Sequence, residues 1–417
     1  MKNKCLESFK HSVVLFLSLF ILHAIVYMTK NMFSAAMASI VEDGVMTKSQ
    51  TGAISAGFWF VYAISQVIGG FAADKYSPSK LIIIGLISGV ISNAIIYVNQ
   101  SYGVIMTVWC INAAFQFGLW PGVFKIVSTQ IMPKFRGTAI FWVLLSTSAG
   151  QAISMLVASI VPKWQQNFII SSIALAVILV LWIVIYNNLE KQMIETEEVK
   201  SQIKDRLHEK TLGMKELSRI SGLPVLLFIS FMITATNNGI KMVTPVMLME
   251  SYENMPAAIA TRMSIILIVF STMGMFIANA VRVKVTKNEM KAVGILLAIG
   301  VPVLALSCFV GKFHYFTILA LLSVAVAFTQ GANPFTNSFA AARFTIYGRG
   351  GTISGILNAV AAVGNIFASY AFPRMSESMP WNAITAIWGI SIIGAIVLAV
   401  CMIKLWTSFI EREHSLD

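Results

Sequence analysis

The sequence has few charged side chains: only 12% of its 417 residues are Asp, Glu, Lys or Arg, against about 25% in an ordinary soluble domain. Apolar residues make up 57% of the chain, and the mean hydropathy is +0.78. This composition excludes a soluble enzyme. The four cysteines are scattered and have no cysteine or histidine neighbours at ligand spacing, so neither a disulfide framework nor a metal site is indicated.

The net charge of +12 does not indicate a nucleic-acid partner, because the basic residues lie in short breaks between long apolar stretches. A bilayer core of about 30 Å needs about 20 apolar residues per helix. We therefore expect an all-α polytopic membrane protein of twelve transmembrane helices. The predicted helices lie at 12–40, 49–73, 80–98, 102–132, 138–161, 167–187, 222–250, 259–281, 291–309, 315–340, 351–373 and 381–408.

One long charged run divides the chain between the sixth and seventh predicted helices, and it is typical of a solvated amphipathic linker. We expect an N-terminal six-helix bundle over 1–187, a cytoplasmic linker over 188–221, and a C-terminal six-helix bundle with a short tail over 222–417. Duplicated halves of this kind are typical of secondary transporters, whose site lies between the halves near mid-membrane.

The two halves also share a sequence pattern. Arg136-Gly137-Thr138 is followed by Gly150, thirteen residues beyond Gly137, and Arg349-Gly350-Gly351-Thr352 is followed by Gly364, thirteen residues beyond Gly351. This pattern indicates an internal repeat.

The distribution of basic residues predicts the orientation. With the N-terminus inside, 22 lysines and arginines fall in cytoplasmic connections and five fall on the opposite side. The positive-inside rule then makes both termini cytoplasmic.

Acidic residues are absent from the interiors of the predicted helices, since all 18 lie in loops or at helix ends. Lys30, Lys125 and Lys241 nevertheless lie inside helices. An ionisable group at mid-bilayer costs about 3 kcal/mol and normally faces a cavity or a partner. Because no buried carboxylate is available, these lysines indicate an anionic substrate. Lys30 and Lys241 occupy equivalent depths in the first and seventh helices, so we expect a facing pair that binds anion from both halves.

Two alternatives bear on this interpretation. Lys125 lies about 10 Å from the inner end of its helix, at 1.5 Å per residue, and its ammonium could extend to the interface instead. A proton-driven carrier generally needs a titratable group inside the membrane, and only His23 is available, although a lone histidine more often packs. Anion exchange is therefore favoured over proton symport.

Polar side chains within the apolar helices are consistent with a cavity, and Thr147, Asn337 and Asn365 are among them. Hydrogen bonding between helices is the alternative explanation. The pairs Trp120-Pro121 and Asn333-Pro334 are predicted to break or kink their helices, because proline removes a backbone hydrogen bond.

Gly70-Phe71-Ala72-Ala73-Asp74-Lys75, followed by Lys80, resembles the loop 2–3 signature of the major facilitator superfamily. The resemblance implies a gate that latches the cytoplasmic side, with Asp74 pairing with nearby cations such as Lys75, Lys80 and Arg136. The usual glycine and arginine run is replaced here by Tyr76-Ser77-Pro78-Ser79.

Three segments resemble the organophosphate:phosphate antiporter family, the group of the glycerol-3-phosphate and hexose-phosphate transporters. Tyr27-x-x-Lys30-x-x-Phe33 is similar to that family's Tyr-x-x-Arg-x-x-Phe pattern, which implies that Lys30 replaces a substrate-binding arginine. Phe115 to Pro121, with Trp120, is similar to its aromatic-proline helix. Gly239-Ile240 and Pro245 match a third segment, in which Asn237 takes the place of a second binding arginine.

The departures bear on the substrate. A point-charge ammonium suits phosphate less well than a bidentate guanidinium does, and Lys241 lies one helical turn beyond Asn237, where it could restore the second cation. The resemblance also implies that Thr147 occupies the position of a site histidine in the glycerol-phosphate carrier. A carboxylate is therefore a rival to a phosphate ester.

We expect a monomeric secondary carrier of the bacterial inner membrane, without cofactor or metal, that moves a small organic anion by rocker-switch alternating access. Lys30 and Lys241 would supply charge, and Tyr27 and Asn237 would supply hydrogen bonds. Trp120, Thr147, Asn337 and Asn365 complete the predicted substrate site. An enzyme is not expected, because no nucleophile–base pair is evident. Two alternatives stay open: a membrane sensor of a phosphorylated sugar, and a drug exporter of the same superfamily, which lipid-facing lysines would favour.

Overall fold

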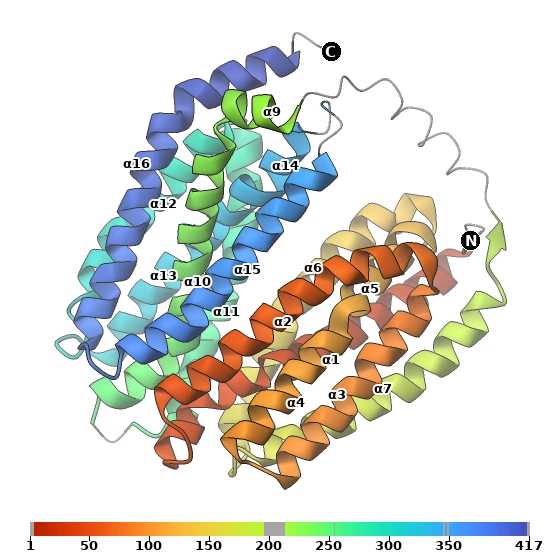
Figure 1. Cartoon of the computed structure of the whole chain (residues 1–417), viewed down its shortest axis with the longest axis horizontal. Coiled ribbons are helices and arrows are strands. Elements are labelled where there is room, and N and C mark those ends of the chain that lie inside the picture. Colours follow the sequence, from red (N-terminus) through yellow and green to blue (C-terminus); the bar gives the residue numbers. More distant parts are fainter. Residues whose placement is uncertain (1–3, 196–212, 254, 345–346, 348–349, 415–417) are drawn as a thin grey trace. The chain divides into compact units, whose positions relative to one another are not determined.

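The computed structural model describes residues 4–195, 213–253, 255–344, 347 and 350–414 (Figure 1). Almost all of them are helical. The long helices are α1 (Phe9–Glu42), α2 (Lys48–Lys75), α3 (Pro78–Val98), α4 (Tyr102–Phe115), α5 (Leu119–Thr129), α6 (Pro133–Ile160), α7 (Gln166–Glu190), α10 (Leu223–Ser251), α11 (Ala257–Lys284), α12 (Glu289–Ser307), α13 (Tyr315–Pro334), α15 (Gly350–Met375) and α16 (Trp381–His414).

Short elements complete the chain. They are the 3₁₀ turn η1 (Gln116–Gly118), the π-helical turn η3 (Phe335–Phe339), and the helices α9 (Met214–Ser221) and α14 (Ala340–Arg343). Two strands of two residues each, β1 (Lys4–Cys5) and β2 (Ile194–Glu195), pair antiparallel.

The predicted all-α polytopic architecture is confirmed, because each of the twelve predicted stretches coincides with a helix or a broken helix. Among the described residues, eleven helices are long and apolar enough to cross a membrane. The remaining predicted stretch, 49–73, is the 28-residue helix α2.

Two of the twelve stretches are broken, and both contain a predicted proline break. In the fourth, η1 separates α4 from α5, and Pro121 lies in the first turn of α5. In the tenth, the π-helical turn η3 begins directly after Pro334. Proline has no N–H for the carbonyl four residues earlier, and π-helical turns are a usual adjustment inside an interrupted helix. The predicted kinks are therefore confirmed.

Helix boundaries follow local sequence. Thr47 and Gln50 form a capping box at the start of α2, which satisfies two backbone N–H groups that have no helical partner. Pro78 and Pro133 lie in the first turn of α3 and α6, where a missing N–H costs nothing. Gly222, with φ of 64°, ends α9 in the left-handed conformation that favours glycine.

By contacts within the chain, the described residues separate into two compact units. The first unit comprises Met1–Lys204 with Ala257–Arg262, and the second comprises Asp205–Pro256 with Met263–Asp417. Part of the predicted linker, 196–212, lies outside the described residues, and α9 forms its last segment.

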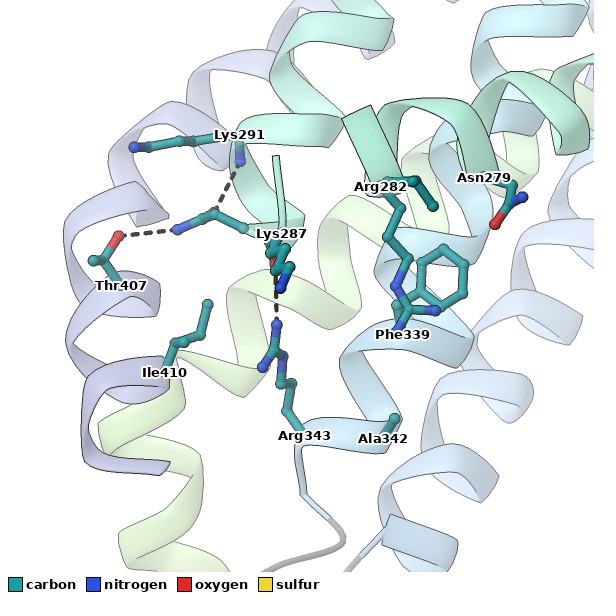
Figure 2. A pocket seen from close by; sticks show the side chains of 11 residues that line it. Asn279, Arg282, Lys287, Lys291, Phe339, Ala342, Arg343, Thr407 and Ile410 are labelled. Carbon is teal, nitrogen blue, oxygen red and sulfur yellow. Dashed lines mark hydrogen bonds between the residues drawn. The ribbon is translucent and has the colours of Figure 1, made fainter. Parts of the chain in front are cut away.

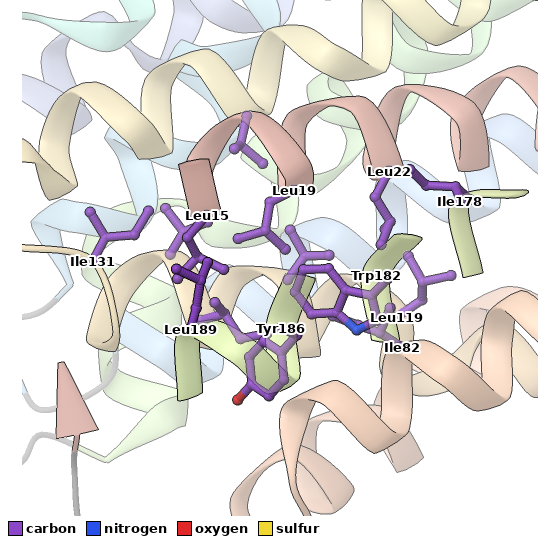
Figure 3. Close-up of a cluster of buried hydrophobic side chains, with 14 of the residues drawn as sticks. Leu15, Leu19, Leu22, Ile82, Leu119, Ile131, Ile178, Trp182, Tyr186 and Leu189 are labelled. Carbon is purple, nitrogen blue, oxygen red and sulfur yellow. The ribbon is translucent and has the colours of Figure 1, made fainter. Parts of the chain in front are cut away.

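The first unit has a core of large apolar side chains between α1 and α7. Figure 3 shows Leu15, Leu19 and Leu22 of α1 facing Trp182 and Tyr186 of α7. The polar tips of the aromatic residues are satisfied: Trp182 donates from its indole N–H to the Ser79 hydroxyl at 3.1 Å, and the Tyr186 hydroxyl donates to Gln130 Oε1 at 3.2 Å. Such tips need a partner when the ring is buried.

A glycine permits close helix packing at matching places in the two units. A Cβ on Gly69 of α2 would lie 1.8 Å from the carbonyl oxygen of Phe117, and a Cβ on Gly274 of α11 would lie 2.1 Å from that of Ala327. Small residues that allow backbones to approach are typical of helix contacts in membranes. The second predicted helix of each half therefore contacts the fourth helix of its own half in the same manner.

Candidate functional site

Lys30 is buried in the first unit, with 5% of its surface exposed. Its ammonium nitrogen lies over four aromatic rings. The distances from Nζ to the ring centroids are 3.2 Å for Tyr62, 4.7 Å for Trp59, 5.1 Å for Tyr27 and 5.8 Å for Phe58. The face of an aromatic ring carries partial negative charge and attracts a cation placed over it.

Two helices build this arrangement, which we call the aromatic cage. Tyr27 lies three residues before Lys30 on α1, and the other three rings come from α2, where Phe58 stacks on Tyr62 at 6.0 Å and Trp59 meets Tyr62 edge-on at 5.7 Å. Among the described residues, no carboxylate forms an ion pair with Lys30. The rings attract the ammonium without cancelling its charge.

Sequence reasoning identified Lys30 and Tyr27 but missed the three rings of α2. The signal was present as Phe58-Trp59-Phe60-Val61-Tyr62, four aromatic residues in five positions of the second predicted helix. The pattern did not reveal that this face of α2 lies against Lys30, because helix pairing is not readable from a single apolar stretch.

Trp120 of α5 lies beside His23, which is on α1 one helical turn before Tyr27. The His23 ring is 5.0 Å from the Trp120 ring and 4.8 Å from the Tyr27 ring. Its Nδ1 is hydrogen bonded to the Ser146 hydroxyl of α6 at 2.7 Å, whereas its buried Nε2 has no hydrogen-bond partner in the part of the chain that the structure describes. His23, Tyr27 and Lys30 thus form one continuous face of α1.

Thr147 was the predicted site residue on α6, and its hydroxyl donates to the Leu144 carbonyl at 2.8 Å. The neighbouring Ser146 is the residue that reaches α1. Thr147 was chosen from the family resemblance, and the sequence carried no signal that Ser146 contacts α1.

Lys241 is buried in the second unit, with 8% of its surface exposed. In the described part of the chain, neither a hydrogen bond nor an ion pair nor an aromatic ring engages its ammonium. Asn237, one turn earlier on α10, donates from Nδ2 to the Thr329 hydroxyl at 2.8 Å and to the Val326 carbonyl at 3.1 Å, both on α13. Its Oδ1 is buried and has no partner among the described residues.

The other predicted amides of the second unit also link helices. Asn365 of α15 accepts a hydrogen bond from Asn238 of α10. Asn337 of η3 accepts one from the Ser230 hydroxyl of α10 at 3.0 Å and donates to Asn333. These contacts tie α10 to the broken tenth helix and to α15.

Glycine contacts show which positions of α1 and α10 correspond. A Cβ on Gly150 would lie 2.3 Å from the carbonyl oxygen of Ala24 and 2.8 Å from the backbone nitrogen of Met28, and a Cβ on Gly364 would lie 3.2 Å from the carbonyl oxygen of Phe231 and 3.2 Å from the backbone nitrogen of Ala235. Lys30 follows Met28 by two residues, and the residue that follows Ala235 by two is Asn237. The repeat glycines therefore match Lys30 with Asn237, and Lys241 lies one helical turn further along its own helix.

The predicted gate residues are only partly described. The side chains of Asp74 and Lys75 lie outside the described residues, and Lys80 is exposed on α3. Arg136 donates to the carbonyls of Ile131 at 2.8 Å and Thr129 at 3.1 Å. It thereby closes the C-terminal end of α5, where backbone carbonyls have no helical donor.

The described residues contain no group of three His, Cys, Asp or Glu side chains that could hold a metal ion. The buried side chains offer one ammonium against aromatic rings in the first unit and one buried ammonium on α10 in the second. Each of them can bind an anion, since a buried cation is stabilised by a negative partner.

Among the described residues, eleven helices are long and apolar enough to cross a membrane, and they lie in two compact units, which defines a polytopic membrane protein. The sequence profile of the Major Facilitator Superfamily matches residues 19–307, and the chain belongs to that superfamily.

Relatives agree with the resemblance to organophosphate:phosphate antiporters. A probable hexose phosphate transport protein of Chlamydia trachomatis is 23% identical over 435 residues, which cover 96% of this chain and 92% of the relative. The membrane sensor protein UhpC of Escherichia coli is 26% identical over 132 residues, which cover 32% of this chain and 30% of the sensor. The structure of peptide transporter POT in complex with sulfate has the same fold, with a TM-score of 0.73, 14% identity, and coverage of 98% of this chain and 97% of that one.

Proposed function

We propose that this protein is a secondary active transporter that moves a small organic anion across the bacterial inner membrane by alternating access. The observation that carries the proposal is the Lys30 ammonium, which is buried against four rings and forms no ion pair with a described carboxylate. Because this buried ammonium has no carboxylate partner among the described residues, an anionic substrate can supply the negative charge that neutralises it.

The aromatic cage explains how the Lys30 ammonium can stay buried while no substrate is bound. Each cation–π contact is worth about 0.5–2 kcal/mol, so several rings offset part of the cost of burying the ammonium when no anion is bound. A bound phosphate or carboxylate would add full charge neutralisation, and we propose that the hydroxyls of Tyr27 and Tyr62, whose rings lie against the ammonium, donate hydrogen bonds to that anion. Binding would then favour closure of the site, because closure buries a neutral pair instead of a bare charge.

Lys241 is the second cation of the proposed site. It stands one helical turn beyond Asn237, the position of the second unit that corresponds to Lys30, and we propose that alternating access brings both ammonium groups to one substrate near mid-membrane. Two cations suit a dianion such as a phosphate monoester. In the arrangement described, both N–H groups of Asn237 are engaged by α13, so we assign Asn237 to positioning α10 and the charge to Lys241.

Anion exchange is the coupling that we propose. All 18 acidic residues lie in loops or at helix ends, so the helix interiors lack the carboxylates with which proton-driven carriers usually take up and release protons. The proposed activity is transport and includes no covalent step. We also propose a monomer with both termini in the cytoplasm, on the positive-inside count.

An organophosphate is the substrate class that we place first. The Chlamydia trachomatis relative, which aligns over nearly the whole chain, is named a probable hexose phosphate transport protein. A small carboxylate is the rival class, because the ammonium of Lys30 lacks the bidentate geometry of the arginine that the motif suggests.

A sensor is the second candidate function, favoured by the similarity of one third of the chain to UhpC, which is named a membrane sensor protein. A sensor would bind the same anion at the same lysines but would move little or none of it.

Uptake into proteoliposomes tests the proposal. Vesicles with wild-type protein, preloaded with inorganic phosphate or left empty, receive labelled glucose 6-phosphate or labelled succinate outside. We expect uptake of one of them that is several times faster into the loaded vesicles. Lys30→Ala should abolish this uptake, and Lys10→Ala, an exposed lysine near the start of the same helix, should leave it intact.

The result that favours the sensor is binding of glucose 6-phosphate, measured by titration calorimetry, without uptake above that of protein-free vesicles. Uptake that is unchanged by Lys30→Ala would overturn the proposed site while leaving transport itself in place.

A further inference from the structure

A pocket of about 730 Å³ opens at one end of the second unit (Figure 2). None of the described residues that line it belongs to α10, the helix that carries Lys241. It is lined by the last turn of α11, the first turn of α12, η3, α14 and the end of α16. These are helix termini of membrane-spanning stretches, so the pocket lies at the depth of lipid headgroups. The positive-inside count places this end on the cytoplasmic side.

Four basic side chains line the pocket: Arg282, Lys287, Lys291 and Arg343. None of the described residues that line it is acidic. The nearby carboxylate of Glu289 is already engaged, because its Oε1 pairs with Arg343 at 2.9 Å and its Oε2 accepts from the Trp406 indole at 2.8 Å. One carboxylate against four cations leaves the pocket strongly positive.

Local contacts hold the lining in place. The Arg282 guanidinium lies over the Phe339 ring, 3.9 Å from its centroid, and Arg343 also donates to the Lys287 carbonyl at 3.0 Å (Figure 2). Asn288 caps α12 by accepting from the Lys291 N–H at 3.0 Å, and it donates to Thr407 of α16 at 2.9 Å. Arg282, Lys287 and Lys291 are exposed and keep their charged ends available to a ligand.

We propose that this pocket binds a phosphate group and is a site separate from the transport site. Guanidinium groups bind phosphate oxygens in a bidentate manner, and lysines add point charge. Basic pockets between helices on the cytoplasmic side bind the headgroups of anionic lipids. The phosphate belongs either to such a headgroup or to a soluble phosphate compound, and the two sources share the chemistry that the pocket recognises.

The experiment uses the full-length protein with Lys287→Gln and Lys291→Gln combined. The matched control combines Lys284→Gln and Lys404→Gln, two exposed lysines of α11 and α16 that do not line the pocket and whose loss changes the net charge equally. Native mass spectrometry measures binding of phosphatidylglycerol, with phosphatidylethanolamine as the reference lipid. Calorimetry measures binding of inorganic phosphate in a Lys30→Ala background, which removes binding at the proposed transport site.

We expect protein with the pocket intact to bind one of the two probes: phosphatidylglycerol or, in the Lys30→Ala background, inorganic phosphate. The pocket variant should lose about thirtyfold in affinity, which is about 1 kcal/mol for each lysine removed. Loss of phosphatidylglycerol binding alone identifies a lipid headgroup, and loss of phosphate binding alone identifies a soluble ligand.

A second variant keeps the proposal testable if the lysine variant is unstable. Ala342→Glu places a carboxylate at an exposed position of the pocket on α14, and it should weaken the same probe. The proposal is overturned if protein with the pocket intact binds neither phosphatidylglycerol nor, in the Lys30→Ala background, inorganic phosphate. It is also overturned if both pocket variants bind as tightly as the Lys284→Gln, Lys404→Gln control.

Discussion

Each of the two units holds a buried lysine, but the two lysines differ in register by one helical turn and have different surroundings. Lys30 lies against four aromatic rings from α1 and α2, whereas Lys241 follows a turn of α10 whose amide, Asn237, is committed to α13. The backbone contacts at Gly150 and Gly364 are shared. These shared contacts match Lys30 with Asn237, so the second cation lies one helical turn further along its helix, and the side chains around the two cations have diverged.

The difference indicates a division of roles between the units. A cation held by rings has a defined position and a reduced burial cost, so Lys30 is suited to be the fixed anchor of an anion. Lys241 has no such support in the described residues and is freer to follow the substrate during closure. We therefore expect the first unit to determine whether an anion binds, and the second unit to determine the preference for a dianion over a monoanion.

Breaking the shared register should have the largest effect on stability. Gly150→Ala puts a Cβ 2.3 Å from the Ala24 carbonyl oxygen and 2.7 Å from Tyr27 Cβ, and overpacking of this kind costs about 1–3 kcal/mol or more. Gly364→Ala meets its neighbours at 3.2 Å and should cost less. Thermal unfolding in detergent checks the order. Gly355→Ala, which meets open space on α15, is the control, and equal midpoints for Gly150→Ala and Gly355→Ala would contradict the packing argument.

Removing the second cation should distinguish dianions from monoanions. Lys241→Gln should weaken binding of glucose 6-phosphate about tenfold, close to 1.4 kcal/mol, and should affect a monoanionic carboxylate less. Titration calorimetry of both ligands measures this, with exposed Lys215→Gln of α9 as control. Wild-type affinity for both ligands would show that Lys241 does not face the substrate.

Weakening the aromatic cage should have a smaller effect. Tyr62→Leu removes the nearest ring, and we expect affinity to fall by about fivefold, within the range of one cation–π contact of about 0.5–2 kcal/mol. Tyr62→Phe keeps the ring and should retain most of the affinity. If Tyr62→Phe lowered the affinity as much as Tyr62→Leu, the hydroxyl of Tyr62 and not its ring face would be the group that matters.

An imposed proton gradient should have the smallest effect. We expect uptake into phosphate-loaded vesicles to change less than about twofold across a gradient of one pH unit, because the helix interiors lack carboxylates that would carry the proton. Accumulation that requires an inward gradient, and that disappears in His23→Ala, would reassign the coupling to His23 and its unpaired Nε2.

Most of the fold could be predicted from the sequence because apolar length is a strong signal in a membrane protein. All twelve predicted stretches coincide with helices, and both proline breaks occur where Pro121 and Pro334 predict them. The repeat glycines were visible as a spacing, although the Ala24 and Ala235 contacts that give them meaning were not.

The site was less predictable, for a physical reason. A buried lysine stands out by its charge, so Lys30 and Lys241 were identified, but the rings that hold Lys30 are ordinary apolar residues within an apolar helix. The role of an amide is equally ambiguous. Asn237, Asn337 and Asn365 all take part in hydrogen bonds within the second unit, and sequence could not separate helix contacts from substrate contacts.

The most direct test of the central claim is the affinity of Lys30→Ala for glucose 6-phosphate, measured by titration calorimetry beside wild type and Lys10→Ala. Removing one partner of a buried charge pair costs about 2–5 kcal/mol, so we predict at least a thirtyfold loss for Lys30→Ala and none for Lys10→Ala. The unfolding midpoint of Lys30→Ala should stay near that of wild type, because no described carboxylate is left without a partner. Wild-type affinity in a folded Lys30→Ala protein would contradict the account.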